Sequence, residues 1–521
     1  MFFLAVVLVL LAVLYVYGTR THYYWKERGV IHDPPIPIFG TDAARYLQKR
    51  SIAQRGADMY WKYPNERFVG YFRGSIPELV IRDPDLVKHI IVTDFPYFYS
   101  RGLQPSHKVI EPLLRNLFFA DGDLWKLLRQ RMTPAFTSGK LKAMFPLIVE
   151  RAERLQAHLL AAAQQGHPLD ARDVMVRYTT DFIGACGFGL DADTLNNDNS
   201  PFRQLGFKIF NITFKRAALV FFKTCFPQIF KPLKLLGQDL EDEILSLVNQ
   251  IQEQRNFKPS GRNDFIDFLM EWQQRGKIVV ESLEETNPDG SGKRVELEMD
   301  DILVAAQAFI FFAAGFETSS SATSFTLHQL AFHPEVQRKV QADIDRVLAQ
   351  HDGRLSYDAI KEMTYLDWVL QEGMRIFPSS GFLWRQCVRK YTLPGTNVTI
   401  DPGVRITVPL VALHNDPQYF DNPSEFRPER FAPEEVAKRH KFVYLPFGDG
   451  PRSCIGGRLG HMQSMAGLAA VLSKFTVGPA PSTPRVLESD PRASIVQSVV
   501  GGIPLMFHAR AASDTHDARS L

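Results

Sequence analysis

The sequence is poor in cysteine. Its 521 residues include four, which stand far apart at Cys186, Cys225, Cys387 and Cys454. No pair of them has the spacing of a zinc site or of a CxxC redox motif. So few cysteines in so long a chain argue against a disulfide-stabilised scaffold and for a reducing compartment.

An excess of charge is missing as well. The chain carries 60 Lys and Arg against 57 Asp and Glu, a net charge of +3, which offers no electrostatic footprint for nucleic acid. Apolar residues at 45% and charged residues at 22% are close to the averages of soluble proteins, which excludes disorder, collagen and a multi-span membrane protein. Phenylalanine is abundant, with 39 residues, and this suits a large apolar cavity and an ordinary core equally well.

Long hydrophobic runs are rare, and the clearest one lies at the N-terminus. Residues 2–17 read FFLAVVLVLLAVLYVY without a charge. A helix of this length reaches about 24 Å, which is short for a hydrocarbon core of ~30 Å, but interfacial aromatic and basic side chains can complete the span. A cleaved signal peptide is the alternative, but it needs a basic segment before the run and small residues after it. We predict a membrane anchor over residues 1–18.

Three cations, Arg20, Lys26 and Arg28, follow the hydrophobic run. By the positive-inside rule they keep the following domain in the cytosol. No second segment is expected to be long enough to span, so we predict a single anchor.

A proline-rich segment, DPPIPIFG at residues 33–40, comes next. Three prolines in four positions favour an extended, stiff backbone. We predict that residues 19–40 form a linker with this segment as its hinge, although a plain loop is an alternative interpretation. No repeat or low-complexity stretch interrupts the chain beyond it, so we predict one large catalytic domain over residues 41–512 and a polar tail over residues 513–521.

The patterning of the large domain is mainly helical. Apolar stripes predict helices over residues 141–165, 240–256 and 334–350. Strand patterns are short and lie at residues 67–72, 79–81 and 404–408. A turn-rich stretch at 287–293 predicts a surface loop. These patterns favour a mainly α fold with small β-sheets (α+β).

One internal segment, residues 302–316, is almost entirely apolar. Fifteen residues are too few to span a membrane, so the helical pattern over residues 299–332 predicts a helix buried through the middle of the protein. Its polar stretch GFETSSS favours a local break or kink. Because buried polar groups need partners, this stretch either contacts packing neighbours or faces a wet cavity.

Cys454 lies in an unusual setting, the run FGDGPRSCIG. Its glycines let backbone N–H groups approach the sulfur closely, and such donors stabilise a thiolate and tune a metal that it holds. Arg452 adds a positive charge, and the helical pattern after Gly457 places a positive helix N-terminus near the sulfur. Core packing of an inert cysteine requires none of these features.

The chain resembles the cytochrome P450 haem-thiolate monooxygenases. The resemblance covers essentially the whole sequence and is closest to the microsomal animal class, in particular the insect enzymes that metabolise xenobiotics. The motifs that carry it are FxxGxRxCxG from Phe447 to Gly456, WxxxR at Trp125 and Arg129, AGxET from Ala314 to Thr318, ExxR at Glu372 and Arg375, and FRPERF with Arg430.

The resemblance implies the P450 fold as a single large haem domain, with haem b as the cofactor. Cys454 then corresponds to the axial thiolate, whose electron push favours O–O cleavage. Haem propionates are anions and need cations. The family pattern assigns that environment to Trp125, Arg129, Arg385, Arg452 and Phe447, with Arg101 as a weaker candidate.

Two further groups take roles from the resemblance. Glu372 and Arg375 share a helix face and are expected to form an internal network with Arg430 that serves folding and haem retention. Glu317 and Thr318 are expected to organise the delivery of protons to dioxygen. The alternative for this pair is a Ser- and Thr-rich helix that hydrogen-bonds its own carbonyls.

The function implied is the insertion of one atom of dioxygen into a lipophilic substrate, with a role in the metabolism of xenobiotics, insecticides or insect hormones. Electrons are expected from NADPH through NADPH-cytochrome reductase, with cytochrome b5 as an optional partner, and the enzyme is expected in the endoplasmic reticulum membrane, with its catalytic domain on the cytosolic side. A haem-thiolate isomerase or dehydratase, and a haem-binding sensor or carrier, are the alternatives.

The substrate is not readable from the sequence beyond its lipophilic character. Candidate pocket residues lie at 104–117, 202–230, 309, 312, 379–382 and 496–500. Residues 202–234 are rich in aromatic and cationic side chains, which is typical of an interfacial segment. We therefore predict that this segment forms a second membrane contact, although a helix pair that covers the pocket shows the same composition.

Overall fold

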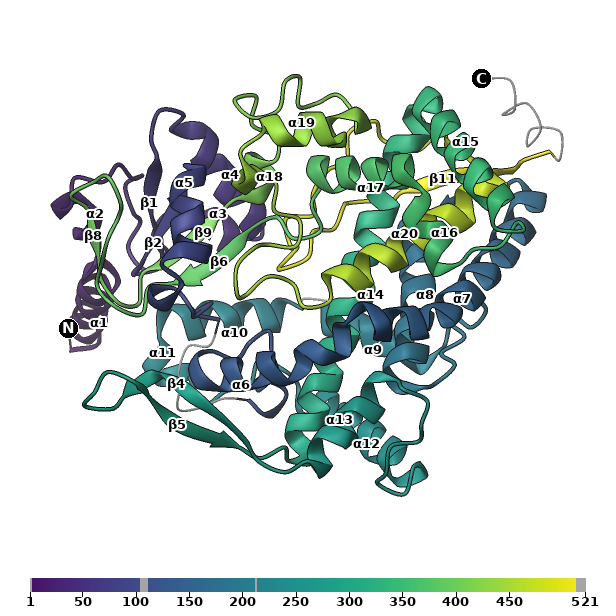
Figure 1. Ribbon diagram of the computed structural model, residues 1–521. Helices are drawn as coiled ribbons and strands as arrows, with labels where there is room; N and C mark the ends of the chain where they lie inside the picture. Colours follow the sequence, from purple (N-terminus) through teal and green to yellow (C-terminus); the bar gives the residue numbers. More distant parts are fainter. Residues whose placement is uncertain (1, 104–110, 211–212, 512–521) are drawn as a thin grey trace.

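Helices make up most of the protein, whose computed structural model describes residues 2–103, 111–210 and 213–511 (Figure 1). The predicted polar tail, residues 513–521, lies outside this described part. The helices are α1 (Phe2–Thr19), α2 (Tyr24–Glu27), α3 (Ala43–Tyr46), α4 (Ile52–Lys62), α5 (Pro84–Lys88), α6 (Gly122–Met132), α7 (Ser138–Gln165), α8 (Ala171–Ile183), α9 (Pro201–Phe210), α10 (Phe214–Cys225), α11 (Pro227–Phe230), α12 (Gln238–Gln254), α13 (Phe265–Gln274), α14 (Asp301–Phe332), α15 (Pro334–Gln350), α16 (Tyr357–Glu362), α17 (Thr364–Ile376), α18 (Leu410–Leu413), α19 (Pro433–Lys438) and α20 (Gly457–Lys474).

The strands form small, separate sheets. They are β1 (Phe68–Arg73), β2 (Ile76–Ile81), β3 (Leu169–Asp170), β4 (Ile278–Thr286), β5 (Gly292–Leu297), β6 (Leu383–Gln386), β7 (Tyr391–Thr392), β8 (Thr399–Ile400), β9 (Arg405–Val408), β10 (Phe475–Pro479) and β11 (Pro504–Ala509). The largest sheet has the order β1-β2-β9-β6, with β2 and β9 parallel. The others are β10-β11-β3, β4-β5 and β7-β8. The predicted mainly α fold with small sheets is confirmed.

The predicted elements agree with the structure to within a few residues. The helix predicted at 334–350 is α15, and those at 141–165 and 240–256 correspond to α7 and α12. The strands predicted at 67–72, 79–81 and 404–408 fall on β1, β2 and β9, respectively. The small shifts fall at the ends of the helices, whose first and last residues an apolar stripe does not mark.

The hairpin of β4 and β5 was not predicted. The loop expected at residues 287–293 is its connecting turn, because Thr286 pairs with Gly292. The signal for β4 is weak, since Val279 is exposed although it is apolar, and strict alternation is lost. The hairpin packs on the N-terminal end of α6, where Asp123 accepts hydrogen bonds from the Leu283 amide and the Ser282 hydroxyl, both at 2.6 Å.

The central element is α14, which packs against α8, α17 and α20 (Figure 1). It is long and apolar enough to cross a membrane, and 72% of its most apolar window is buried inside the protein. The prediction that only the N-terminal segment is long enough to span a membrane is therefore wrong. The burial of α14 nevertheless identifies it as the predicted core helix. The predicted break at residues 315–321 is also wrong, since the helix continues through them to Phe332.

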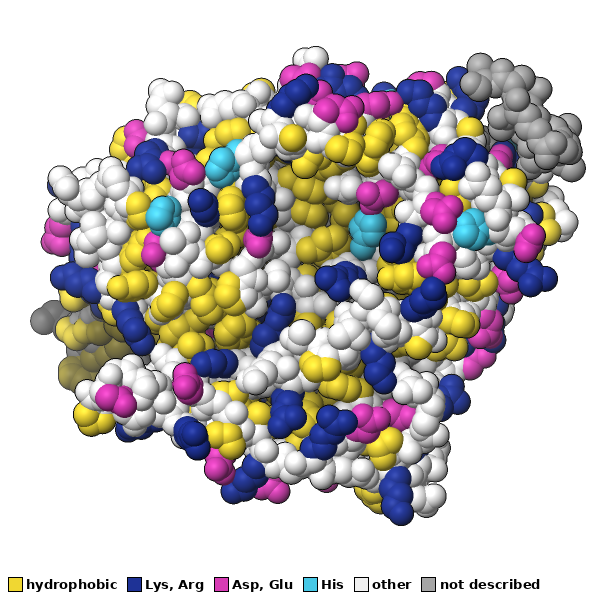
Figure 2. All heavy atoms as spheres, in the orientation of Figure 1, with side chains coloured by type: hydrophobic (Ala, Val, Ile, Leu, Met, Phe, Trp, Pro, Cys, Tyr) yellow, Lys and Arg dark blue, Asp and Glu magenta, His cyan; other side chains and the backbone are white. Residues whose placement is uncertain are grey.

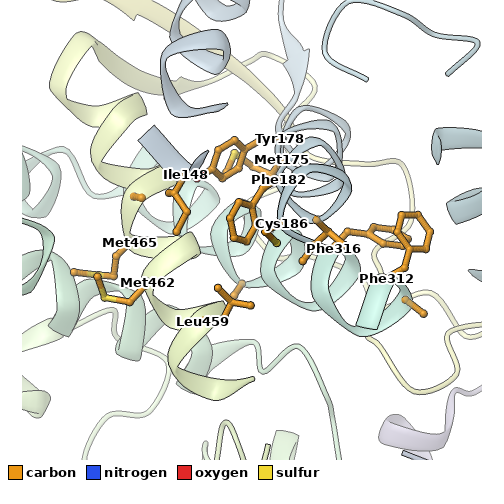
Figure 3. Close-up of a cluster of buried hydrophobic side chains, with 14 of the residues drawn as sticks. Ile148, Met175, Tyr178, Phe182, Cys186, Phe312, Phe316, Leu459, Met462 and Met465 are labelled. Atoms are coloured by element: carbon orange, nitrogen blue, oxygen red, sulfur yellow. The ribbon is translucent and has the colours of Figure 1, made fainter. Parts of the chain in front are cut away.

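Part of the main hydrophobic core surrounds α14 (Figure 3). Side chains from α7, α8, α14 and α20 meet there, together with Cys186 from the short π-helical turn η5 (Gly184–Phe188). Helices α14 and α20 are buried on most sides, as expected of helices that cross the middle of a protein. The labelled members are Ile148, Met175, Tyr178, Phe182, Cys186, Phe312, Phe316, Leu459, Met462 and Met465. This core fixes the position of α14 relative to the start of α20.

The N-terminal region has two parts. Helix α1 is almost wholly exposed and is long and apolar enough to span a membrane, as predicted for the anchor. The segment that follows packs against the largest sheet, since Trp25 is fully buried and donates a hydrogen bond to the Tyr71 carbonyl at 3.0 Å. Residues 36–40 form a turn that is closed by reciprocal backbone hydrogen bonds between Ile36 and Gly40. The extended backbone predicted for residues 33–40 is therefore not found in residues 36–40.

Candidate active site

The loop that carries Cys454 is a tight turn held by its own backbone. The amide of Cys454 donates to the carbonyl of Phe447 at 2.8 Å. Gly450 adopts φ +73°, and a Cβ on it would lie 2.0 Å from the carbonyl oxygen of Ile91, so only glycine fits there. Helix α20 begins at Gly457 and directs its positive end towards the loop.

Cys454 borders an internal space. Its side chain has accessible surface although it lies deep in the protein. This deep position raises the pKa of its thiol, whereas the Gly456 amide and Arg129 act to lower that pKa. On α14, Ala314 is likewise exposed and Thr318 is half-buried, although this helix crosses the middle of the protein. Exposed side chains at such depth line a cavity and not the outer surface.

Four arginines, Arg101, Arg129, Arg385 and Arg452, gather around the Cys454 loop. Arg129, on α6, donates to the carbonyl of Ser453 at 2.7 Å, and Arg101 donates to the carbonyl of Arg452 at 3.3 Å. The Arg452 guanidinium lies 4.5 Å from the ring centroid of Trp125, also on α6, and both side chains are buried. Arg101, the weaker sequence candidate, thus joins the other predicted residues.

One carboxylate, Asp121, neutralises part of the charge of this cluster. Asp121 accepts from Arg452 Nη2 at 2.8 Å, from the Ser100 hydroxyl at 2.7 Å and from the Arg101 amide at 2.8 Å. It precedes α6 at the N-cap position but makes no capping bond. Sequence reasoning missed Asp121, although its place just before the WxxxR helix was an available signal.

The arginine cluster carries more positive charge than its protein neighbours neutralise. Burial lowers the pKa of Arg101 to about 10 and that of Arg385 to about 9, and repulsion from Arg101 adds to the effect on Arg385. Burial also holds the pKa of Arg452 well below its usual value. Arg452 Nε and Nη1 and Arg385 Nε are buried without a hydrogen-bond partner. Such donors fit an anionic ligand, and carboxylates suit them best.

Phe447 closes the same loop from the side of α20. A Cβ added to Gly457 would lie 3.4 Å from Cγ of Phe447, so the phenyl ring packs directly on the first turn of this helix. Phe447 therefore links the turn that carries Cys454 to the helix that follows it.

Glu317 and Thr318 are neighbours on α14 but point to different surroundings. Glu317 is buried and pairs with Arg172 on α8. Burial raises the pKa of Glu317, and the Arg172 charge opposes this. Thr318 Oγ1 donates to the Ala314 carbonyl at 2.7 Å, which is the backbone bond that the alternative interpretation expects. The structure therefore does not bring the two groups into one hydrogen-bonded pair.

A buried ionic network joins α17 to the segment that contains Arg430. Glu372 and Arg375, on α17, are fully buried and bonded at 2.7 and 2.8 Å. Arg430, in the short 3₁₀ helix η6 (Pro428–Phe431), lies 3.3 Å from Glu372. Arg375 also donates to the carbonyls of His414 and Pro423. The sequence predicted this network, and the structure adds the backbone carbonyls that it holds.

Several predicted pocket residues lie near Thr318. The Ser379 hydroxyl donates to the Thr318 carbonyl at 2.8 Å, and Ser380 pairs with Val496 in an isolated bridge. Phe309 and Phe312 are buried, and the Phe312 ring lies 5.7 Å from that of Phe202. The candidates at 104–110 and 211–212 lie outside the described residues.

The chain matches a family model and many curated proteins. The model, Cytochrome P450, covers residues 32–501. Cytochrome P450 6B2 of Helicoverpa armigera is 37% identical over 97% of this chain and 97% of its own length. Cytochrome P450 6a2 of Drosophila melanogaster is 38% identical over 95% and 96%, and cytochrome P450 6k1 of Blattella germanica is 34% identical over 97% and 96%.

The family implies a haem cofactor, and the residues present fit one. A thiol borders the internal space, and guanidinium nitrogens of Arg385 and Arg452 are buried without a partner, as propionate carboxylates require. With matches that extend over nearly the full length, the chain belongs to the cytochrome P450 family and is a haem-containing monooxygenase, an oxidoreductase.

Proposed function

We propose that this monooxygenase inserts one oxygen atom into lipophilic substrates, xenobiotics among them, with electrons that NADPH-cytochrome reductase supplies at the endoplasmic reticulum membrane. The observation that carries this proposal is the position of Cys454 on an internal space between the arginine cluster and α14. The similarity to the insect cytochromes P450 6B2 and 6a2 supports the proposal that xenobiotics are among the substrates. Helix α1 supports the membrane location.

In this proposal the cofactor is held from two directions. Cys454 is the only protein ligand to iron, and Arg129, Arg385, Arg452 and Trp125 bind the propionates, with Arg101 beside them. Thiolate-ligated haem supplies the chemistry that cleaves dioxygen. Asp121 orients Arg452 and removes part of the excess charge, while the backbone bond to Phe447 fixes the direction of the sulfur.

Thr318 is proposed to position water for proton delivery. Its hydroxyl hydrogen is committed to the Ala314 carbonyl, so its lone pairs remain free to accept a hydrogen bond from water. Glu317 is proposed to act from greater distance as a proton relay, because it lies on the side of α14 that faces Arg172. The two residues then act in sequence through water and not as a contact pair.

Replacing Thr318 by alanine should uncouple electron use from product formation. General acid–base groups contribute about 10²–10⁴-fold, and less where water substitutes. We expect NADPH oxidation within several-fold of wild type, while the ratio of product to NADPH consumed falls by about tenfold and hydrogen peroxide rises. The measurement uses purified holoenzyme with reductase and a turned-over lipophilic substrate.

The matched control is Thr323→Ala on the same helix. Thr323 makes the same type of bond, to the Ser319 carbonyl at 2.9 Å, but it is buried in the core. Its product ratio should remain at the wild-type value. An unchanged ratio in Thr318→Ala would mean that this hydroxyl only bonds its own helix.

The electron donor is proposed to bind the face formed by α6, the Cys454 loop and the start of α20. Figure 2 shows Lys and Arg side chains spread over this face, and Arg458 and Lys441 on it are exposed. Reductase-dependent NADPH consumption separates a monooxygenase from a haem sensor or an isomerase. Conversion of a lipid hydroperoxide without NADPH would favour an isomerase or dehydratase instead.

The segment at residues 202–234 is proposed to form a second membrane contact. Phe207, Phe214 and Ile229 are exposed by 70, 81 and 70%. Tyr17, at the end of α1, stacks on Phe226 at 5.4 Å and donates to the Cys225 carbonyl at 3.0 Å. The C-terminal end of α10 therefore lies beside the end of the anchor, so the segment is joined to the part of the protein that enters the membrane in this proposal.

Deleting residues 2–18 should leave a protein that still sediments with membranes at high salt, because apolar side chains of 202–234 insert independently of charge. Adding Phe214→Ser and Ile229→Ser should release most of it into the soluble fraction. Val486→Ser is the control, since Val486 is also 81% exposed but lies outside the segment. Complete release by the deletion alone would contradict the second contact.

A further inference from the structure

The turn at residues 378–381 joins α17 to β6 and lies beside α14. Helix α17 packs against α14 (Figure 1). Where the chain leaves α17, the ring centroid of Phe377 lies 4.1 Å from that of Phe325 on α14. Two residues later, the Ser379 hydroxyl donates to the Thr318 carbonyl of the same helix at 2.8 Å. The turn therefore contacts α14 at the residue that is proposed to hold water for proton delivery.

Other parts of the protein hold this turn in place. The side-chain amide of Gln497 donates to the Pro378 carbonyl at 2.6 Å, and the backbone amide of Gln497 donates to the Ser379 carbonyl at 2.8 Å. A Cβ added to Gly381 would lie 2.3 Å from Cβ of Ala53 on α4, so only glycine fits at that position. The Ser379 hydroxyl is thus presented to α14 from a fixed backbone.

The acceptor of the Ser379 hydroxyl is a carbonyl inside a continuous helix. The distance of 2.8 Å is normal for an O–H···O hydrogen bond. Because α14 continues past Thr318 to Phe332, the same carbonyl also accepts the helical bond from the amide four residues later. A carbonyl oxygen has two lone pairs. Both lone pairs of the Thr318 carbonyl are therefore in use, and neither remains for water.

The side-chain hydroxyl of Thr318 differs from its carbonyl in this respect. Its hydrogen is committed to the Ala314 carbonyl, but its lone pairs can still accept a hydrogen bond from water. Water that reaches Thr318 from the internal space therefore finds an acceptor on the side chain and none on the backbone. The bond from Ser379 makes the hydroxyl the single position on this residue that can hold water.

A second hydroxyl from another element bonds α14 close by. Thr179, on α8, places its hydroxyl oxygen 2.9 Å from the Phe316 carbonyl. Thr179 is fully buried in the hydrophobic core, whereas Ser379 and Thr318 are half-buried beside the internal space. The two bonds are alike in type and differ in whether water can reach the carbonyl, which makes Thr179 a matched reference.

We propose that Ser379 is a positioning residue of the monooxygenase reaction. Its hydroxyl fixes Thr318 against the turn and closes the Thr318 carbonyl to water, so that the water used in proton delivery stays on the Thr318 hydroxyl. In this role Ser379 acts through Thr318 and needs no contact with the substrate. The inference rests on the proposed function, because it requires the role that is proposed there for Thr318.

Ser379→Ala removes the hydroxyl but keeps the backbone contacts of the turn. One lone pair of the Thr318 carbonyl becomes free and competes with the Thr318 hydroxyl for water. The loss of one neutral hydrogen bond changes a population by about three- to tenfold. We expect the ratio of product to NADPH consumed to fall by about threefold and hydrogen peroxide to rise, measured with purified holoenzyme and reductase.

A double-mutant cycle with Thr318→Ala tests whether Ser379 acts through Thr318. Without the Thr318 hydroxyl no water remains to be held in place, so Ser379→Ala should cause no further loss. The product ratio of the double variant should then equal that of Thr318→Ala within about twofold. Losses that multiply in the double variant would contradict the inference, because the two residues would act independently.

Thr179→Ala is the matched control, and Ser379→Thr is the conservative variant. Thr179→Ala removes a hydroxyl that bonds α14 in the core, so it should lower the unfolding midpoint while the product ratio stays at the wild-type value. Ser379→Thr keeps a hydroxyl and should retain most of the wild-type ratio. Equal losses of the ratio in Thr179→Ala and Ser379→Ala would show that any loosening of α14 uncouples the enzyme, which would overturn the positioning role.

Substrate binding separates a positioning role from a direct contact with the substrate. The dissociation constant of the substrate, measured by the haem spectral shift, should be the same in wild type and Ser379→Ala although their product ratios differ. A loss of affinity that accounts for the lower ratio would instead assign Ser379 to the wall of the pocket and reject the inference.

The same variants distinguish this inference from the proposed function. An unchanged product ratio in Ser379→Ala, together with uncoupling in Thr318→Ala, rejects only the positioning role of Ser379. An unchanged ratio in Thr318→Ala rejects the role proposed for Thr318 and, with it, the basis of this inference.

Discussion

Cys454→His is expected to abolish the carbon monoxide difference band that is characteristic of thiolate ligation, and with it all monooxygenase turnover. Imidazole can still bind iron, but it lacks the electron donation of a thiolate. The loop cannot readily shift to reposition a longer side chain, because Gly450 packs closely against Ile91 and Gly457 contacts Phe447. The spectrum of the reduced, carbon monoxide-treated protein reports the outcome directly.

Cys186→Ala provides the comparison for this variant. Cys186 is a buried thiol in the core of Figure 3, and burial raises its pKa to a value at which it stays protonated. This variant should keep the thiolate band at full height per haem. Survival of the band in Cys454→His would reject Cys454 as the ligand.

Arg375→Met should destabilise the protein by about 3–5 kcal/mol, the usual effect of removing one partner of a buried ion pair. Glu372 would remain buried with only Arg430 and the Arg427 amide as donors. The carbonyls of His414 and Pro423 would lose their donor as well. Denaturant unfolding followed by fluorescence, and haem retained per protein chain, measure the loss.

Arg427→Met is the matched variant for the network. Arg427 lies in the same region and bonds Asp421 at 2.7 Å, but its side chain is 36% exposed. Exposed ion pairs contribute about 0–1 kcal/mol, so its unfolding midpoint should hardly move. An equal loss of unfolding free energy in Arg375→Met and Arg427→Met would contradict the larger contribution expected of the buried network.

Regular patterns in the sequence were sufficient for much of the fold. The apolar stripe of residues 334–350 coincides with α15, and the almost entirely apolar run at 302–316 correctly indicated the buried helix α14. Both patterns depend on the order of side chains within one element, so they can be read without knowing which elements pack against it. β4 was missed because half of its pattern is irregular, and a hairpin is stabilised by its contacts with α6.

Parts of the candidate site were equally accessible from the sequence. The spacing of Phe447, Gly450, Arg452 and Cys454 is local, so the motif can be read within one short stretch of chain. The ExxR pair is also local, because residues three apart share a helix face. Asp121 was missed because its role comes from Arg452, which is separated from it by 331 positions in the chain.

The sequence by itself thus determined the family, the α+β class, the exposed N-terminal helix and the Cys454 loop, since each depends on a continuous stretch of chain. Only the tertiary structure separated Glu317 from Thr318, through Arg172 on another helix. It alone placed Arg405 beside Trp384, the Gly102 carbonyl and the Glu78 carboxylate that Arg73 also binds. The reason is physical: the charge balance of a buried group is set by side chains that approach it in space, and their separation along the chain leaves no pattern to detect.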